Sequence, residues 1–219
     1  HHDFAAAKTA YVFKTMVDPF IGKYSFVKVC SGVLKGDDVL YNPESDAEAK
    51  IGKIYTLSGN KPVEVQELFA GDIGAIAKLT STKTGDTLST KNTPVSYGRT
   101  EYSKPYTYMK YVVNNKGDED KVSQALAKMM AEDVTLKVVN DSENRQSLIY
   151  GMGDQHLEVT ASKLAERYKV GIRLETPKVA FRETIRKNSD VDTKYKKQSG
   201  GHGQYGHVKM RFEPSGDLD

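Results

Sequence analysis

The fold of this chain is decided by residues 106–177, which read YTYMKYVVNNKGDEDKVSQALAKMMAEDVTLKVVNDSENRQSLIYGMGDQHLEVTASKLAERYKVGIRLETP. Segments rich in Val, Ile, Leu and Tyr open and close this stretch and recur at its centre, as is typical of strands. Two windows instead repeat their apolar residues every three or four positions, the period of a helix that packs one face on a core. These residues are Val122, Ala125, Leu126, Met129 and Met130 in the first window, and Leu157, Ala161, Leu164, Ala165 and Tyr168 in the second. The order predicts a ferredoxin-like βαββαβ domain of the α+β class, with two helices on one face of a sheet.

Polar and glycine residues mark the ends of these elements. Asp118, Glu119 and Asp120 crowd the start of the first helix, where acidic groups favour a helix N-terminus by capping and through the helix dipole. The second helix is expected to end near Gly171, because glycine readily adopts the left-handed conformation found at helix ends. Residues 140–142, Asn-Asp-Ser, predict the turn of a hairpin between the two central strands.

Residues 3–92 predict a small, closed or nearly closed β-barrel, because closure removes exposed strand edges. Turn signals such as Gly36-Asp37, Asn42-Pro43 and Gly71-Asp72 separate short runs rich in Val, Ile, Tyr and Phe. The expected strands are TAYVFKTM (9–16), YSFVKVCSGVL (24–34), DDVLYN (37–42), KIGKIYTL (50–57), VEVQELF (63–69) and DIGAIAKL (72–79). In the last of these, Ile73, Ala75, Ala77 and Leu79 alternate with Gly74, Ile76 and Lys78, which predicts one face on a core.

Two further regions complete the expected organisation. Residues 93–105 lack periodicity and contain Pro94, Gly98 and Pro105, so they are interpreted as a linker. Residues 178–219 contain strand-like runs but few large apolar side chains, too few to bury a core alone. They are therefore interpreted as the incomplete beginning of a further α/β domain.

The composition is that of a soluble globular protein. Of 219 residues, 38% are hydrophobic and 28% are charged, which excludes a disordered chain. No apolar run approaches the roughly 18 residues of a membrane span, so no membrane partner is expected. The single cysteine, Cys30, is expected to be a buried structural thiol in a reducing cytoplasm, since one cysteine forms neither an internal disulfide nor a metal cluster.

Positive charge is concentrated near the C-terminus. Residues 178–211 contain nine Lys and Arg residues but only three acidic ones, although the whole chain has a formal charge of only +3. Charge gathered in this way predicts a polyanionic partner for this region.

The sequence contains no motif that would make this chain an enzyme by itself. The phosphate-binding pattern G-x-x-x-x-G-K-S/T is absent, since Gly22-Lys23 is followed by Tyr24 and lacks the first glycine. We therefore expect no catalytic residue and no bound nucleotide in this chain. Gly151-Met152-Gly153 is interpreted as a tight strand-to-helix turn, because His156 stands where a dinucleotide fingerprint has its third glycine.

The histidines offer little support for a metal site. His202 and His207 flank a glycine-rich loop without further ligands at suitable spacing, so no metal is expected. His156 and Glu158 are two positions apart and point to different sides of a helix, which favours packing or an inter-domain contact over catalysis.

The glycine-rich loop near the C-terminus is the candidate functional site. Glycines permit close backbone approach, while histidine, glutamine and tyrosine side chains offer hydrogen bonds and a stacking surface of the kind that reads irregular RNA. The loop residues are Ser199, Gly200, Gly201, His202, Gly203, Gln204, Tyr205 and Gly206, and the supporting bases are Lys194, Lys196, Lys197, Lys209 and Arg211. Composition alone supports equally well a flexible hairpin tip on a solvated basic stem.

The chain resembles elongation factor G, the GTPase that drives ribosomal translocation. The resemblance to its second domain is carried by VFKTMVDPFIGKYSFVKVCSG (12–32) and AGDIGAIAKLTSTKTGDTL (70–88). KVSQALAKMMAEDVTL (121–136) and GMGDQHLEV (151–159) resemble the third domain, and TPKVAFRETI (176–185) and KKQSGGHGQYGHV (196–208) the start of the fourth. The resemblance implies a barrel of the translation-factor type.

The resemblance also implies partners. The barrel would touch small-subunit ribosomal RNA, and the ferredoxin-like domain would lie against ribosomal protein S12 and relay the nucleotide state. The fourth domain would enter the decoding site and hold transfer RNA and messenger RNA. A GTPase domain in cis, ahead of residue 1, would bind GTP with magnesium, and the protein would be a cytoplasmic monomer.

Two departures from the family pattern keep alternatives open. The third-domain motif usually reads GMGELHLEI, but Asp154 and Gln155 replace Glu and Leu here, and His202 replaces the usual Arg of the tip. A divergent paralogue or a ribosome-protection GTPase, acting in antibiotic resistance or recycling, therefore remains an alternative. An independent hydrolase or metal enzyme that uses His202 and His207 is a third possibility, from a different class.

Overall fold

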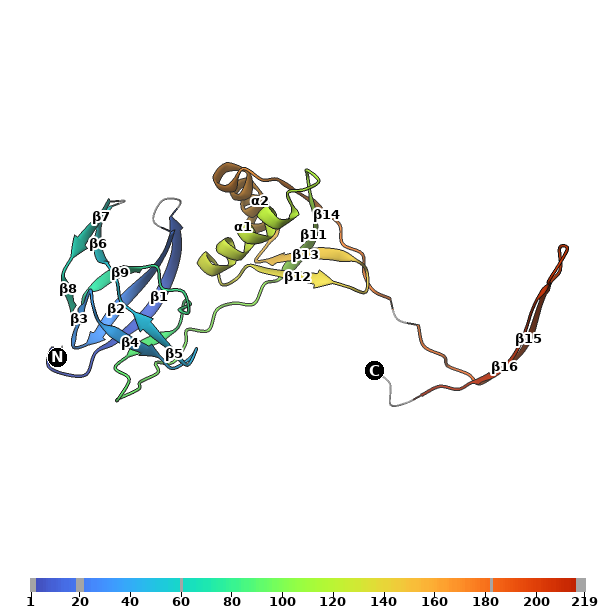
Figure 1. Cartoon of the computed structure of the whole chain (residues 1–219), viewed down its shortest axis with the longest axis horizontal. Coiled ribbons are helices and arrows are strands. Elements are labelled where there is room, and N and C mark those ends of the chain that lie inside the picture. The colour runs from blue at the N-terminus through green and yellow to red at the C-terminus, as the bar shows by residue number, and fades with distance from the viewer. Residues whose placement is uncertain (1–2, 19–21, 60, 182, 216–219) are drawn as a thin grey trace. The chain divides into compact units, whose positions relative to one another are not determined.

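The computed structural model describes residues 3–18, 22–59, 61–181 and 183–215. The chain divides into two compact units, His1–Lys178 and Val179–Asp219. The first unit contains a β-barrel-like domain followed by an α+β domain, and the second contains a single hairpin (Figure 1). The predicted fold class, a barrel followed by a ferredoxin-like domain, is confirmed.

The barrel domain is built from ten short strands. Eight form one antiparallel sheet in the order β5-β4-β10-β1-β2-β9-β6-β7, while β3 and β8 pair separately. Their bounds are β1 Thr9–Asp18, β2 Gly22–Ser31, β3 Val33–Lys35, β4 Val39–Asn42, β5 Ala47–Lys50, β6 Ile54–Ser58, β7 Lys61–Val65, β8 Glu67–Phe69, β9 Ile73–Ala77 and β10 Thr87–Ser89. Val12, Val27, Ile54, Ile76 and Leu88 are fully buried in the core that the sheet encloses.

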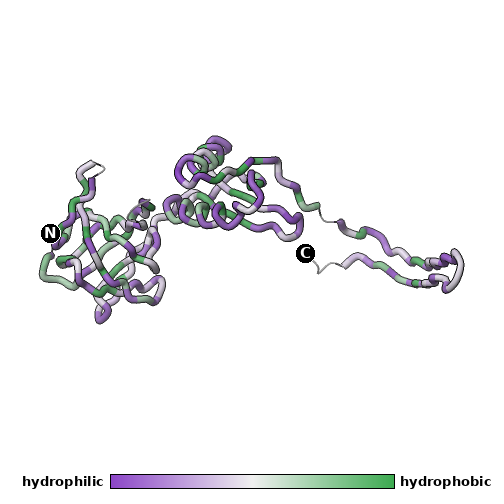
Figure 2. The backbone as a smooth tube through the Cα atoms, turned by 45° about the horizontal axis from the view of Figure 1, so that its top comes forward, coloured by the Kyte–Doolittle hydropathy of each residue, from purple (hydrophilic) through white to green (hydrophobic). Residues whose placement is uncertain are grey.

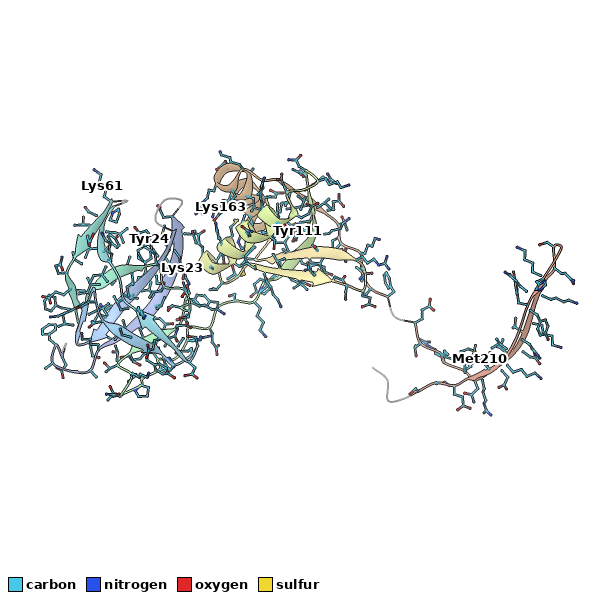
Figure 3. The ribbon with its side chains drawn as sticks, viewed as in Figure 1. Lys23, Tyr24, Lys61, Tyr111, Lys163 and Met210 are labelled. Carbon is cyan, nitrogen blue, oxygen red and sulfur yellow. The ribbon has the colours of Figure 1, made fainter. Side chains whose placement is uncertain are left out.

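The one-sided alternation predicted for residues 73–79 is wrong. Strand β9 lies between β2 and β6, and its residues are buried on both faces. Ile76 belongs to the main core, whereas Ala75 and Ala77 pack with Tyr24 in a second cluster (Tyr24 is labelled in Figure 3). Ile73, expected to face the core, is 57% exposed because it begins the strand at the rim.

The segment that follows β10 is fastened to the barrel although it contains no helix or strand between residues 91 and 106. The Tyr97 hydroxyl lies 2.8 Å from Thr9 Oγ1, and the Tyr97 N–H donates to Thr87 Oγ1. Arg99 forms an ion pair with the buried Asp86 carboxylate. The first half of the expected linker is therefore part of the barrel's surface.

The α+β domain has the predicted βαββαβ order. Its elements are β11 Thr107–Val113, α1 Glu119–Glu132, β12 Lys137–Asp141, β13 Gln146–Gly151, α2 Asp154–Tyr168 and β14 Ile172–Glu175. The antiparallel sheet has the order β12-β13-β11-β14, and both helices cover one of its faces (Figure 1). Leu126, Ile149, Leu157 and Leu164 are fully buried between helices and sheet. No helix among the described residues is long and apolar enough to cross a membrane.

Several details of the helices differ from expectation. Asp118 occupies the N-cap position of α1 without a side-chain capping bond, and its carboxylate instead accepts hydrogen bonds from Lys121 and Asn115. Those bonds lower the pKa of Asp118. Helix α2 ends at Tyr168, because Lys169 adopts the left-handed conformation with φ of 56°, two residues before Gly171. Ala165 is exposed, and Thr160 takes a buried place on the inner face.

Cys30 is only half-buried, so the expectation of a buried thiol is wrong. Its place on β2 puts the side chain at intermediate exposure, with Sγ 3.5 Å from the Lys28 carbonyl oxygen.

Candidate nucleic-acid interface

The predicted loop lies at the end of a long two-stranded hairpin. Strands β15 (Ser189–Lys197) and β16 (Gln204–Phe212) pair antiparallel over nine residue pairs, from Ser189 with Phe212 to Lys197 with Gln204. The tip is formed by residues 198–203, and the remaining predicted loop residues, Gln204 to Gly206, belong to β16. Every described residue of both strands is exposed except Gly206, which has intermediate exposure.

Two of the four glycines are required by the backbone of this tip. Gly200 and Gly201 have φ angles of 80° and 71°, in the left-handed region that residues with a Cβ adopt at a cost. Gly203 and Gly206 have no such φ. The tip is thus a turn whose geometry depends on consecutive glycines, with the side chain of His202 exposed just beyond them.

The charge of the hairpin changes along its length. Near the base, Lys209 pairs with Asp192 at 3.0 Å and Arg211 pairs with Glu213 at 2.7 Å. Lys194, Lys196 and Lys197 lie nearer the tip, and no ion pair of theirs is found within the described part of the chain. Of the five supporting bases, therefore, only the three lysines beside the tip carry charge that is not already offset by a neighbouring acid.

The two faces of the hairpin have different chemistry. The register places Lys194, Lys196, Tyr205 and His207 on one face, since side chains two apart in a strand share a face. The other face carries five exposed apolar residues, Val191, Tyr195, Val208, Met210 and Phe212. The register also places Thr193, Lys197 and Gln204 on this face, nearer the tip. Figure 2 shows hydrophobic and hydrophilic residues interspersed along both strands, and Met210 is labelled in Figure 3.

The two histidines of the hairpin are not brought together as ligands. His207 Nε2 contacts Asp192 Oδ1 at 2.5 Å, whereas His202 lies in the exposed tip. Within the described ranges, no group of three His, Cys, Asp or Glu side chains is arranged to hold a metal ion.

His156 has a structural role in the α+β domain. The Met152 N–H donates to His156 Nδ1 at 3.1 Å, and His156 Nε2 lies 2.9 Å from Asp133 Oδ2. Because Nδ1 accepts a hydrogen bond, Nε2 carries the ring proton and donates it to Asp133. The side chain thereby joins the β13–α2 turn to the end of α1, and the interpretation of residues 151–153 as a tight turn agrees with this geometry.

A contact between the barrel and the α+β domain involves residues that the sequence did not indicate. The Val17 N–H donates to Glu132 Oε1 at 2.7 Å, and Arg167 Nη2 donates to the Val17 carbonyl oxygen at 2.8 Å. Glu132 and Arg167 also pair with each other at 2.9 Å, which raises the pKa of Arg167. This clamp, Glu132 with Arg167 on the backbone of Val17, bonds both backbone groups of Val17 in the part of β1 that extends beyond its pairing with β10. No local pattern reveals it, since a Glu and an Arg on two amphipathic helices look like ordinary surface residues.

The comparisons with known proteins cover nearly the whole chain. Residues 7–91 match the family model described as elongation factor G domain 2, and residues 103–176 match elongation factor G, domain III. Residues 177–218 match elongation factor G, domain IV.

Among solved structures, the chain is similar to a crystal structure of a protein from Thermus thermophilus, with a TM-score of 0.77 and 32% sequence identity. The match covers 96% of this chain and 32% of that one, so the chain spans about a third of the length of its structural relative. Three consecutive domain models of one family thus match in order along the chain, on a fold that contains the corresponding barrel and α+β domains. The chain belongs to the elongation factor G family of translation factors, and it contains the family's domains 2, III and IV.

Proposed function

We propose that this chain is the ribosome-docking and relay portion of a factor that promotes GTP-dependent translocation of transfer RNA and messenger RNA. The observation that carries the proposal is the hairpin tip, where two glycines with positive φ form an exposed turn beside three lysines without acidic partners in the described part of the chain. Such a tip can approach a nucleic-acid backbone closely and offset its phosphate charge.

The other parts of the chain would serve docking and relay. The barrel would touch small-subunit ribosomal RNA, the α+β domain would lie against ribosomal protein S12, and the hairpin would enter the decoding site. The clamp on Val17 supports a relay, because it joins the barrel to both helices of the next domain. We infer that the parent protein works as a monomer in the cytoplasm.

GTP and magnesium would be bound elsewhere in the parent protein. The chain lacks the glycine cradle and lysine of a phosphate-binding loop, so its residues do not fit the nucleotide. A GTPase domain in cis would supply hydrolysis, and we assign no catalytic residue in this chain.

The test compares lysines that differ in their pairing. Replacing Lys194, Lys196 and Lys197 by Gln in the parent protein should slow translocation and weaken ribosome binding. The slope of log affinity against log salt should decrease by about 0.7–0.9 for each lost phosphate contact. The matched control is Lys209→Gln with Arg211→Gln, which removes paired bases and should change the slope less. Equal effects of both sets, or an unchanged slope for the first, would contradict the proposal.

A divergent paralogue, or a factor for ribosome protection or recycling, is the second candidate. Gln155 is exposed on α2 where family members carry an apolar leucine, and His202 replaces the permanently charged arginine of the tip. If these changes weaken translocation, Gln155→Leu combined with His202→Arg should increase the translocation rate of the parent protein. An unchanged rate would remove the support for this candidate.

A further inference from the structure

The sheet of the α+β domain has one face that the helices do not cover. Met109, Tyr111 and Val113 of β11 point toward the helices, as does Ile149 of β13 (Tyr111 is labelled in Figure 3). Because side chains alternate along a strand, the residues between them lie on the opposite, open face. The open face therefore carries Tyr108, Lys110 and Val112 of β11, Lys137, Val139 and Asp141 of β12, Gln146, Leu148 and Tyr150 of β13, and Arg173 and Glu175 of β14. Of these residues, Gln146 and Leu148 are buried.

Two tyrosines stack on each other at one end of this open face. Tyr108 and Tyr150 are direct partners in the ladder, and their ring centroids are 5.0 Å apart with an interplanar angle of 23°. They stand on β11 and β13, the two central strands of the four. A stacked pair keeps one outer ring face on each member, on which a further planar group can stack.

This pair is more exposed than a tyrosine pair in the barrel, although Tyr150 itself is half-buried. Tyr24 and Tyr55 pack edge to face with centroids 5.7 Å apart, and Tyr24 is only 8% exposed. Tyr108, by contrast, is 39% exposed, and Tyr106, two residues before it, is 78% exposed. The barrel pair is a core contact, whereas the pair on the open sheet face meets solvent.

The charge beside the stacked pair is positive. Lys137 pairs with Tyr150 in the ladder and is exposed, and within the described part of the chain it forms no ion pair. Farther along the face, Glu175 is shared between Lys110 at 2.8 Å and Arg173 at 2.7 Å, so one acid faces two bases. Anionic groups would therefore be attracted to the surface around the tyrosines.

The chain that leaves the sheet is fastened at the opposite end of β13. The Gln146 side chain donates to the Lys178 carbonyl oxygen at 2.8 Å and accepts from the Lys178 N–H at 2.9 Å. Gln146 also donates to Asp141 Oδ2 at 2.9 Å. Because Gln146 begins β13 and Tyr150 lies near its end, this attachment lies at the end of the strand away from the tyrosine pair.

We propose that this face, defined by Tyr108, Tyr150 and Lys137, binds single-stranded RNA. Bases would extend the tyrosine stack, and Lys137 would contact a phosphate. A four-stranded sheet with solvent-accessible aromatic rings on its two central strands, here the exposed Tyr108 and the half-buried Tyr150, is suited to unpaired bases, whose flat faces stack on such rings. The surface lies in the first unit, so the proposal does not depend on the hairpin tip.

The test measures binding of a fluorescein-labelled octauridylate to the full chain in which Lys194, Lys196 and Lys197 are already Gln, which removes the hairpin's contribution. Tyr108→Leu and Tyr150→Leu should each weaken binding by about tenfold, because stacking on an aromatic ring contributes to the affinity for each base. Tyr108→Phe and Tyr150→Phe keep the ring and should bind as the unchanged chain does. Lys137→Gln should reduce the slope of log affinity against log salt concentration by about 0.7, because one phosphate contact is lost. Lys163→Gln on α2 (labelled in Figure 3) should leave this slope unchanged.

A second measurement needs no substitution. The oligonucleotide should slow the acetylation of Lys137 relative to that of Lys163 in the unchanged chain, as followed by mass spectrometry. Leucine variants that bind the oligonucleotide normally, or equal acetylation of Lys137 with and without it, would overturn the proposal. Leucine variants of the parent protein that lose ribosome affinity while keeping oligonucleotide affinity would also overturn it, and would indicate a protein partner instead. None of these outcomes depends on whether the hairpin lysines act in translocation.

Discussion

The clamp between the barrel and the α+β domain can be broken by Glu132→Ala. The substitution removes the acceptor of the Val17 N–H at 2.7 Å and the partner of Arg167 at 2.9 Å. It leaves the bond from Arg167 to the Val17 carbonyl oxygen in place. Arg167→Ala does the reverse, since it removes the donor to the carbonyl and leaves the Val17 N–H bonded to Glu132. The two variants therefore separate the two halves of the clamp.

The free energy that Glu132→Ala should cost can be estimated from how exposed Glu132 and Arg167 are. A hydrogen bond to a charged group contributes about 1.5–3 kcal/mol, whereas an exposed ion pair contributes about 0.2–1 kcal/mol. The side chains of Glu132 and Arg167 are 18% and 33% exposed, so the values lie between these cases. We expect Glu132→Ala to lower the local free energy of opening at Val17 by about 2 kcal/mol, which corresponds to roughly thirtyfold faster amide exchange.

Amide hydrogen exchange at Val17 is the direct assay. Exchange should accelerate in Glu132→Ala but much less in Arg167→Ala, where the amide keeps its acceptor. Glu166→Ala is the matched control, because Glu166 is an exposed carboxylate next to Arg167 on α2 and is not part of the clamp. An unchanged Val17 exchange rate in Glu132→Ala, or equal acceleration in both clamp variants, would refute the reasoning.

Three further outcomes are expected. Gly151→Ala should lower the free energy of unfolding by about 1–3 kcal/mol, measured by urea denaturation, because its Cβ would lie 2.7 Å from Leu157 Cδ2. Gly201→Ala should weaken RNA binding in a filter-binding assay by straining the tip, whose φ there is 71°, whereas Gly206→Ala should be neutral because nothing lies within 4 Å of its Cβ. Burial raises the pKa of Asp133, but hydrogen bonds from Thr135 and the nearby His156 outweigh this and leave the pKa lowered. Its stabilising contribution should therefore be complete above about pH 4 and be lost as the pH falls further, and acid titration of Asp133→Asn should show a shallower loss of stability.

The fold could be predicted from the sequence where the spacing of apolar residues pointed to a single type of element. The two helices follow from the sequence because Val122, Leu126, Leu157 and Leu164 repeat at the helical period and are all buried. The signal failed at β9, where Ile76 packs into one core and Ala75 into another, because in a strand buried on both faces an alternating pattern does not mark a solvent-exposed face.

Strand β10 was not predicted from the sequence, because two of its three residues are polar. In β10, Thr87 and Ser89 are fully buried, and both accept hydrogen bonds from backbone N–H groups of the segment that follows. A Thr-Leu-Ser sequence indicates neither burial nor a strand, since its polar groups become acceptable in a core only after distant backbone donors reach them.

In the candidate site, too, local features could be predicted from the sequence, whereas contacts between distant residues could not. Sequence alone located the glycine-rich tip and its bases because these are contiguous, but it could not distinguish Lys209, which pairs across the hairpin with Asp192, from Lys194. That distinction depends on the register of the ladder, as does the stack of Tyr108 on Tyr150, which are 42 positions apart in the sequence and become neighbours only when β11 pairs with β13. Register thus decides which charges and rings remain available to a partner. A one-residue shift in either ladder would move these side chains to the other face and should abolish binding there while leaving the composition unchanged.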